Sequence, residues 1–277
     1  MAIWLHQPPF CVPIERCNNF VTIHPTALID SSAIVADDIE VGPYSVIGPH
    51  VEIGSGTTIE SHVVIKGPTT IGANNHIYQF SSVGEACQDL KYKGEPTRLV
   101  IGDNNVIREG CTLHRGTIQD AGITQLGSNN LLMANVHIAH DCVVGDNIII
   151  ANNAALAGHV KISDHAILGG FTAVHQFCQL GAHCMTGAGS VVLKDIPAFV
   201  MANGNAVAPH GINTEGLKRR GFSKSAIRGL REAYKVIYRQ GNTLEEAITQ
   251  LQKMVSEVNE VAILVASLQA STRGIIR

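Results

Sequence analysis

The sequence predicts a parallel β-helix followed by a small helical domain. From Ile23 to Val83 every sixth residue is Ile or Val. The period resumes after residue 100 and continues to Val192, shifted once by one residue and with Thr186 as its one exception. Gly or Ala often follows the aliphatic position, and aromatic residues make up only 5% of the chain. A period of six is typical of a parallel β-helix, in which each short strand buries one aliphatic side chain.

Two segments, 85–100 and 115–125, interrupt this period. Insertions in a solenoid leave it as loops, and such loops often carry a binding surface. The first segment brings Gln88, Asp89 and Lys91 within a few residues of one another. We therefore expect a binding loop at 85–100, and a merely solvated loop is the alternative for both segments.

After Pro197 the period ends and helix signals begin. Ser223 is a candidate N-cap for a helix that reaches about Arg239, and Thr243 opens a capping box before a second helix. The apolar stretch 258–268 predicts a third. Helices in this position would cover the open end of the β-helix, where the last coil otherwise exposes unpaired strand edges.

The expected organisation is an irregular extension at residues 1–20, a β-helix at 21–197 and a helical domain at 198–277. A net charge of −3 gives no reason to expect nucleic acid as a partner, because such proteins need a basic face. Seven cysteines without a C-x-x-C spacing argue against a disulfide framework or a zinc ribbon, and favour the reducing cytoplasm. The chain has no run of 18 apolar residues, so no membrane span is expected.

The chain has 13 histidines, and several recur at the spacing of the coil. If three hexapeptides make one coil of about 18 residues, histidines one coil apart stack on one ledge of the solenoid. The set that meets this condition, with the loop at 115–125 discounted, is His114, His137, His140, His159 and His175. A lone corner histidine is usually a solvated polar residue, but a stacked set favours a functional site.

Two chemistries suit such a ledge: a zinc site made of neutral imidazoles, or general base catalysis by one histidine. The pair His140–Asp141 favours the second, because a carboxylate can fix the tautomer of an imidazole and stabilise its charged form. Neighbouring residues of a strand point to opposite faces, so this contact requires a corner. Gly158 is a candidate for a bare backbone N–H that stabilises an oxyanion.

Several segments resemble one known family. They are QDLKYKGEPTR (88–98), HRGT (114–117), NLLMANVHIAHDC (130–142), ANNAALAGHV (151–160), AVHQFC (173–178) and NTEGLKRRGF (213–222). With the repeats, they are similar to the UDP-N-acetylglucosamine O-acyltransferases, which catalyse the first committed step of lipid A synthesis. The resemblance implies a left-handed β-helix and a cytoplasmic homotrimer with active sites between subunits. It extends from about residue 23 to 277, so the first twenty residues lie outside it.

The implied reaction transfers an (R)-3-hydroxyacyl group from the phosphopantetheine arm of acyl carrier protein to the 3-hydroxyl of UDP-N-acetylglucosamine. By resemblance, His140 is the general base, Asp141 orients it, and Gly158 N–H holds the thioester oxyanion. Neither a covalent acyl-enzyme nor a metal or other cofactor is implied.

The resemblance also implies a set of substrate contacts. It comprises Gln88, Asp89, Lys91, His114, His137, His159, His175, Gln176, Asn213, Glu215, Arg219 and Arg220. Ala188 matches the position that limits acyl length, where relatives carry glycine or a bulkier residue, so the preferred chain length stays open. Lys218–Arg220 and the basic residues from Arg228 to Arg239 suggest a face that attracts acidic acyl carrier protein.

Three other readings remain. The N-acyltransferase of the same pathway and fold carries a sizeable N-terminal uridine-binding domain, for which only twenty residues remain here. A zinc carbonic anhydrase built on a β-helix needs three imidazoles that converge across a subunit interface, and its ligand spacing is not seen. A non-enzymatic β-helical scaffold leaves the stacked histidines and the polar loop at 85–100 without a role.

Overall fold

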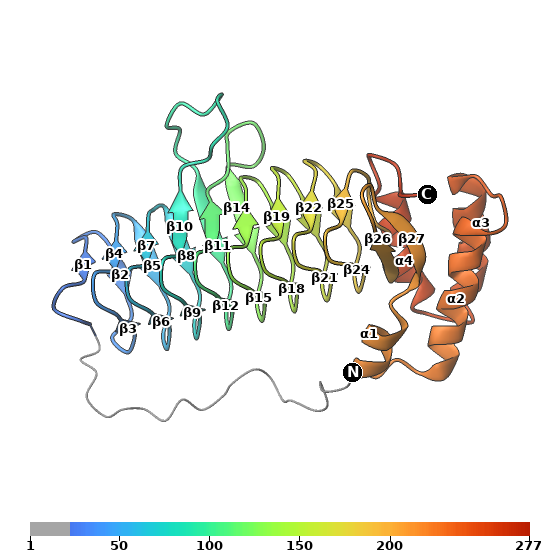
Figure 1. The fold of residues 1–277 in the computed structure, drawn as a ribbon, viewed down its shortest axis with the longest axis horizontal. Helices are drawn as coiled ribbons and strands as arrows, with labels where there is room; N and C mark the ends of the chain where they lie inside the picture. Colours follow the sequence, from blue (N-terminus) through green and yellow to red (C-terminus); the bar gives the residue numbers. More distant parts are fainter. Residues whose placement is uncertain (1–22) are drawn as a thin grey trace.

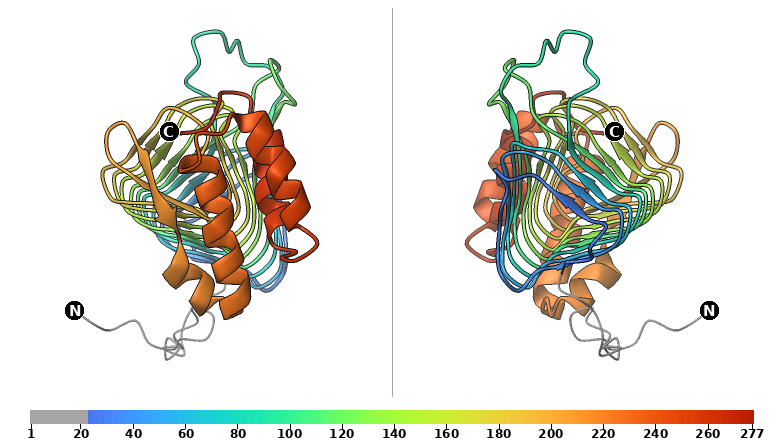
Figure 2. Two further views of the ribbon diagram at one scale, coloured as in Figure 1. Left: turned by 90° about the vertical axis from the view of Figure 1, so that its right-hand side faces the viewer. Right: turned by 90° about the vertical axis from the view of Figure 1, so that its left-hand side faces the viewer.

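The computed structural model describes residues 23–277, so the extension expected at residues 1–20 lies outside the described part of the chain. From residue 23 the chain winds into a left-handed parallel β-helix, and helices cover its C-terminal end (Figure 1). Viewed along its axis, the β-helix is a triangular prism with one sheet on each side (Figure 2). We call the three sheets A, B and C.

The strands follow one another in the order B, C, A from β1 to β25, and β25 of sheet B is followed directly by β26 of sheet A. Sheet B contains β1 (Leu28–Ile29), β4 (Val46–Ile47), β7 (Val64–Ile65), β10 (Ser82–Glu85), β13 (Thr112–His114), β16 (His137–Ile138), β19 (Ala155–Leu156), β22 (Ala173–Val174) and β25 (Val191–Val192). Sheet C contains β2 (Ile34–Val35), β5 (Val51–Ile53), β8 (Thr69–Ile71), β11 (Arg98–Ile101), β14 (Ile123–Leu126), β17 (Val143–Val144), β20 (Lys161–Ile162) and β23 (Gln179–Leu180). Sheet A contains β3 (Glu40–Val41), β6 (Thr58–Ile59), β9 (His76–Ile77), β12 (Val106–Ile107), β15 (Leu131–Leu132), β18 (Ile149–Ile150), β21 (Ile167–Leu168), β24 (Met185–Thr186), β26 (Val200–Asn203) and β27 (Ala208–Ile212).

The aliphatic residues of the six-residue period form the core, as predicted. In sheet B, Val83 pairs in register with Leu113, which pairs with Ile138, and all three side chains are fully buried. The exception, Thr186, is also buried, and its hydroxyl hydrogen-bonds the Thr172 hydroxyl at 2.9 Å. A hydroxyl is tolerated there because it has a partner.

The corners between strands place non-glycine residues in the left-handed region of φ. On the turns from sheet B to sheet C, which we call the B–C corner, Asp141, His159 and Phe177 have φ of 59°, 62° and 65°. The N–H of His159 donates to His140 O at 3.0 Å in the preceding coil, and Phe177 N–H donates to Gly158 O at 3.1 Å. Because the coil below fixes each turn in this way, side chains one coil apart stand above one another.

Both interruptions of the period are loops, as predicted. The first leaves the solenoid between β10 and β11, and the second between β13 and β14. Each therefore emerges at the B–C corner, where the two loops lie side by side in both views (Figures 1 and 2). The insertions and the histidine ledge share one corner of the prism.

The C-terminal helices are α1 (Thr214–Arg219), α2 (Lys224–Tyr238), α3 (Leu244–Met254) and α4 (Val261–Gln269). The predicted N-cap Ser223 and the capping box at Thr243 are both present. The third predicted helix begins at Val261, three residues later than expected. Within residues 23–277, no helix combines the length and apolar character needed to cross a membrane.

The strands β26 and β27 and the helix α1 lie after Pro197, where the six-residue period has ended and does not predict them. Strand β26 adds to sheet A parallel to β24, and β27 returns antiparallel to β26. The six-residue helix α1 follows directly. Phe199, which is fully buried, joins the second hydrophobic core that the helices form over the end of the solenoid.

Candidate active site

The strongest concentration of polar side chains lies on the B–C corner in the middle of the solenoid. His140 and Asp141 form the turn between β16 and β17, and His159 occupies the equivalent turn one coil later, between β19 and β20. His114 ends β13 and His137 begins β16, one coil apart on sheet B. The structure thus brings together four of the five predicted histidines.

His140 and Asp141 contact each other although they are neighbours in sequence. His140 Nδ1 lies 2.8 Å from Asp141 Oδ2. The left-handed φ of Asp141 turns its side chain back toward His140, which supplies the corner that the contact requires. Nδ1 therefore carries the proton and Nε2 is left free to accept one from a substrate.

Asp141 is 3% exposed and fully hydrogen-bonded. Its carboxylate accepts from Thr117 N–H at 2.8 Å and from the Thr117 hydroxyl at 2.6 Å, while its own N–H donates to Thr124 Oγ1. These donors hold the carboxylate in one orientation beside His140. Thr117 belongs to the second loop and was not predicted as a site residue. The sequence signal that includes it is the segment HRGT (114–117), one of the segments that carry the family resemblance.

His114 and His137 form a second, more deeply buried imidazole pair. Their ring centroids lie 5.0 Å apart, edge to face, and the Thr112 hydroxyl lies 2.7 Å from His137 Nδ1. Burial, with help from the His114 and His140 rings, lowers the pKa of His137 to about 4. Burial also lowers the pKa of His114. Both rings are neutral at pH 7 and suit hydrogen bonding to a substrate rather than charge stabilisation.

Gly158 lies against the ring of His140. A methyl group at Gly158 would come within 2.5 Å of His140 Cε1, so only glycine fits there. Gly158 is buried, and among the described residues none accepts a hydrogen bond from its N–H. A free N–H beside the proposed base is the arrangement that an oxyanion hole requires.

The first loop starts beside this group. Burial raises the pKa of the Cys87 thiol, and the nearby carboxylates of Asp89 and Asp141 push in the same direction. Asp89 Oδ1 accepts a hydrogen bond from Lys91 N–H at 2.9 Å. Gln88 and Lys91 are exposed. Cys87 therefore lies within electrostatic range of Asp141, and the predicted contacts Gln88 and Lys91 are open to solvent.

His175 and Gln176 occupy the next turn of the same corner and are exposed. His175 Nδ1 lies 3.1 Å from Gln176 O. In residues 23–277 no hydrogen bond or ring contact joins His175 to the other four histidines. The structure places it on the ledge but outside the hydrogen-bonded group.

The predicted nucleotide contacts lie on a different corner, the turns from sheet C to sheet A. Asn213 is 1% exposed and caps α1: its Oδ1 accepts from Gly216 N–H, and its Nδ2 donates to His183 O. Glu215 is exposed and pairs with Lys218 at 2.7 Å. These residues are not brought to His140 within one chain.

Arg219 and Arg220 close α1 on this second corner. Arg219 is exposed. The Nη1 of Arg220 is buried without a partner among the described residues, and burial lowers the pKa of its guanidinium. Ala188 lies on the third corner, between β24 and β25, and is exposed. One chain therefore distributes the predicted site over all three corners.

A metal ion at this site would use the same residues as the hydrogen-bonded pair, together with His159. One ligand atom each from His140, Asp141 and His159 lies within 4.8 Å of the others. However, Asp141 Oδ2 already accepts from the Thr117 hydroxyl and His140 Nδ1. Donors saturate that oxygen, so the arrangement favours a hydrogen-bonded dyad.

Acidification is expected to destabilise the fold between about pH 6.5 and pH 4. Burial lowers the pKa of both His137 and His183 from 6.5 to about 4. Between these values the unfolded chain binds more protons. The free energy of unfolding therefore has its full value above pH 6.5. It decreases as the pH falls from 6.5 toward 4, by up to about 1.4 kcal/mol per pH unit for each group.

Urea unfolding at pH 7, 5.5 and 4.5 measures this slope. In a His183→Phe variant the slope should be shallower, because one of the two shifted groups is removed. The fold should tolerate the change, because phenylalanine already occupies a turn with the same left-handed φ at Phe177. A Thr70→Ala control, which changes an exposed residue and removes no titratable group, should keep the original slope. Equal slopes in all three proteins would contradict the assignment.

Comparisons with known proteins agree along most of the chain. A family model described as "Udp N-acetylglucosamine O-acyltransferase; Domain 2" matches residues 195–276, and one described as "Bacterial transferase hexapeptide (six repeats)" matches residues 123–158. A protein of Thiobacillus denitrificans named acyl-[acyl-carrier-protein]–UDP-N-acetylglucosamine O-acyltransferase is 62% identical over 256 residues, covering 92% of this chain and 99% of the relative.

Solved structures give the same result. LpxA from Acinetobacter baumannii is 56% identical, with a TM-score of 0.91 over 93% of this chain and 100% of that one. The UDP-N-acetylglucosamine acyltransferase of Arabidopsis is 36% identical, with a TM-score of 0.79 over 92% of this chain and 100% of that one. The similarity therefore includes both the solenoid and the helices that cover its end.

Proposed function

Because this chain belongs to the UDP-N-acetylglucosamine O-acyltransferase family, we propose that it transfers an (R)-3-hydroxyacyl group from acyl carrier protein to the 3-hydroxyl of UDP-N-acetylglucosamine, the first step of lipid A biosynthesis. The observation that carries the proposal is the group made by His140, Asp141 and Gly158. It combines a base with a free Nε2, a buried carboxylate behind it and a free N–H beside it.

The reaction follows from this geometry. His140 Nε2 takes the proton of the sugar 3-hydroxyl as its oxygen attacks the thioester carbonyl, and Asp141 stabilises the imidazolium that forms. Gly158 N–H donates to the oxyanion of the tetrahedral intermediate. On collapse the C–S bond breaks, and the departing thiolate takes the proton from His140. The acyl group arrives on the phosphopantetheine arm, and no metal or other cofactor takes part.

The distribution of residues over separate corners supports a homotrimer with shared sites. His140 lies on the B–C corner, whereas α1 carries Glu215, Arg219 and Arg220 on the corner between sheets C and A. In the proposed trimer, α1 of one subunit contacts the nucleotide bound at the ledge of its neighbour. Asn213 contributes by fixing α1 to the solenoid.

The remaining predicted contacts take roles that fit their positions. His114 and His137, both neutral, hydrogen-bond the sugar, and His159 lies next to His140. The exposed residues His175 and Gln176 lie further along the ledge, toward the diphosphate and the acyl chain. The loop residues Gln88, Asp89 and Lys91 contact the sugar nucleotide. Ala188 of the third corner limits the acyl length.

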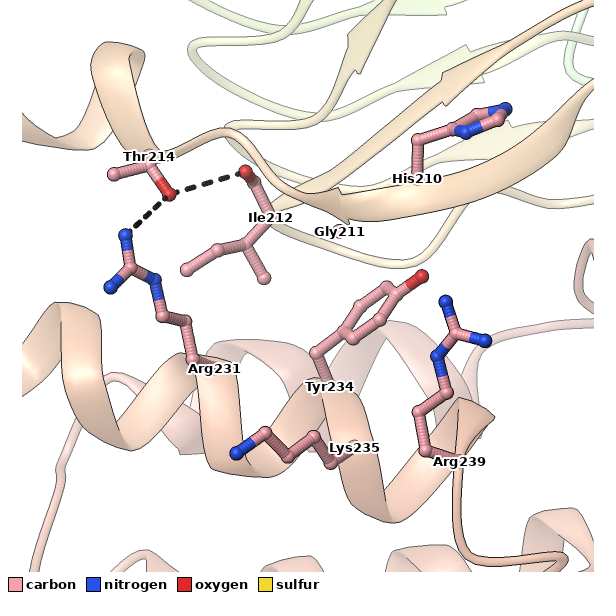
Figure 3. Close-up of a pocket in the computed structure, with 8 residues that line it drawn as sticks. All are labelled: His210, Gly211, Ile212, Thr214, Arg231, Tyr234, Lys235 and Arg239. Atoms are coloured by element: carbon pink, nitrogen blue, oxygen red, sulfur yellow. Dashed lines mark hydrogen bonds between the residues drawn. The ribbon is translucent and has the colours of Figure 1, made fainter.

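A basic hollow between β27 and α2 is the proposed docking place for acyl carrier protein. It has a volume of about 430 Å³ and is lined by His210, Gly211, Ile212, Thr214, Arg231, Tyr234, Lys235 and Arg239 (Figure 3). Arg231 of α2 and Arg239, the C-cap of α2, lie at opposite ends of the group that lines the hollow. Among the interactions within residues 23–277, Lys235 is the one lining residue that pairs with an acidic group, Glu232. Acyl carrier protein is strongly acidic, so this surface would speed its association.

Charge reversal tests this docking surface. In an Arg231→Glu/Arg239→Glu variant, KM for the acyl carrier protein substrate should rise about tenfold at low salt, because long-range attraction becomes repulsion. KM for the sugar nucleotide should not change, and salt near 0.5 M should shrink the effect because it screens exposed charges. Steady-state kinetics at two ionic strengths measure both. A Lys253→Glu control on α3 should behave as the wild type, and an equal effect in that control would contradict the docking surface.

An acyl-transfer assay with purified protein tests the function itself. The substrates are UDP-N-acetylglucosamine and 3-hydroxyacyl carrier proteins of several chain lengths, and mass spectrometry of the product distinguishes an O-acyl ester. Transfer to the 3-hydroxyl supports the proposal and gives the preferred length. A folded protein that transfers none of these chains would refute it, and a fully active monomer in light scattering would refute the shared site.

We place the reaction in the cytoplasm, where the five free cysteines of the described residues remain reduced.

A further inference from the structure

Asp120 lies in the second loop and is not among the predicted site residues. Its carboxylate contacts His159 on the B–C corner. Its Oδ2 lies 2.9 Å from His159 Nδ1. The Asp120 side chain is 48% exposed, whereas that of His159 is 11% exposed. A surface loop therefore supplies a carboxylate to a nearly buried imidazole at the centre of the site.

The ring of His159 is held on its other sides as well. It stacks on Phe177 with centroids 4.4 Å apart and planes 12° apart. Its edge meets His140 at 5.1 Å and 89°. Its Nε2 lies 3.8 Å from Asp141 Oδ2, the oxygen that contacts His140. His159 thus joins two carboxylates, one from the loop and one from the catalytic pair.

The Asp120 carboxylate determines where the proton of His159 resides. A carboxylate only accepts hydrogen bonds, so it requires the proton on Nδ1 and disfavours the tautomer protonated on Nε2. With the proton on Nδ1, a neutral His159 presents the Nε2 lone pair to the site beside Asp141. The hydrogen bond from His159 is also the main reason that the pKa of Asp120 is lowered.

Other charged groups face this pair from each neighbouring element. Asp141 and His140 lie on the turn after β16, and His114 lies behind His140. Lys161 of β20 adds a positive charge near Asp120. Asp120 is nevertheless the only one of these groups hydrogen-bonded to His159 within the described residues. Its removal should therefore alter His159 more than any other substitution nearby.

We propose that Asp120 is a positioning residue for acyl transfer, which acts through His159 by fixing its ring and placing its proton on Nδ1. This inference rests on the proposed function for its kinetic consequence, but the state of His159 can be observed without activity. Asparagine at position 120 offers either an amide oxygen or an amide N–H to Nδ1, so both tautomers become accessible.

Nitrogen NMR of protein labelled at histidine provides the first test. In the wild type, His159 should show a protonated Nδ1 when neutral. In Asp120→Asn the signal should shift toward a mixture of the two tautomers, because the amide can donate to Nδ1 as well as accept from it. An Asp120→Glu variant should restore part of the Nδ1-protonated signal. An Asp37→Asn control removes an exposed carboxylate elsewhere and should leave the His159 signals unchanged.

A double-mutant cycle provides the second test. Asp120→Asn alone should lower kcat/KM about tenfold and shift its acidic limb, whereas in a His159→Gln background it should have no further effect. An equal loss in both backgrounds would show that Asp120 only orders the loop and would overturn the proposal. Unchanged His159 signals in Asp120→Asn would overturn it as well. If the wild type transfers no acyl group, the proposed function fails, while the NMR result still decides whether Asp120 controls His159.

Discussion

His140→Ala is expected to lower kcat of acyl transfer by a factor of about 10² to 10⁴, the contribution of a positioned general base. The structure gives a reason for the size of the effect. In the variant Asp141 stays hydrogen-bonded to Thr117, so its negative charge remains at the site. The imidazole whose charged form this carboxylate would stabilise is gone. Of the neighbouring rings, His114 is buried and His137 is partly buried, and both are neutral. Within residues 23–277 neither ring hydrogen-bonds Asp141.

Single-turnover rates with UDP-N-acetylglucosamine and acyl carrier protein substrates check this prediction. A His24→Ala variant, remote from the ledge, serves as the control and should keep full activity. Circular dichroism should show the same fold in all three proteins. A loss of less than tenfold in His140→Ala would mean that another group removes the proton, with His159 the next to test.

Gly158→Ala is expected to reduce kcat by at least about 10², although it adds a single methyl group. That methyl would lie 2.5 Å from His140 Cε1 and 2.6 Å from Nε2, so the ring or the backbone must move. His140 is bound to Asp141 through Nδ1, and moving the ring breaks this contact. A displacement near 1 Å is enough for a loss of this size.

Gly170→Ala on a neighbouring corner is the matched control. A methyl there would meet only Asn152 O at 3.3 Å, a contact that a small adjustment relieves. The control should keep nearly full activity, and both variants should unfold within a few degrees of the wild type. Full activity in Gly158→Ala would contradict the close packing of Gly158 against His140. It would also contradict the proposed role of the Gly158 N–H in binding the oxyanion.

The solenoid could be predicted because its signal is local and repeated. Each strand buries one aliphatic residue, so the period marks nearly every strand from Leu28–Ile29 onward. The sequence predicts that His140 and Asp141 could act together, but it does not predict the contact between their side chains. That contact depends on the left-handed φ of Asp141. The preceding coil imposes this φ, and the residue type at position 141 does not predict it.

The rest of the site depends on contacts between distant segments. Thr117 and Asp120 lie in a loop without a period, and their partners, Asp141 and His159, follow 24 and 39 residues later in the sequence. The strands β26 and β27 also escaped prediction, because the six-residue period had ended before them. Sequence patterns describe how a segment folds locally, whereas a loop acquires its partners only from the coils beside it.

The stacking of coils has a consequence for how the protein unfolds. In a solenoid each repeat is stabilised mainly by its two neighbours, so opening starts at an end and spreads inward. Helices α2, α3 and α4 pack over the C-terminal end, and the coils that carry His114, His140 and His159 lie in the middle of the stack (Figure 1). Fraying therefore reaches the turns of the proposed active site last, and amide hydrogen exchange should be slowest in the coils that carry them.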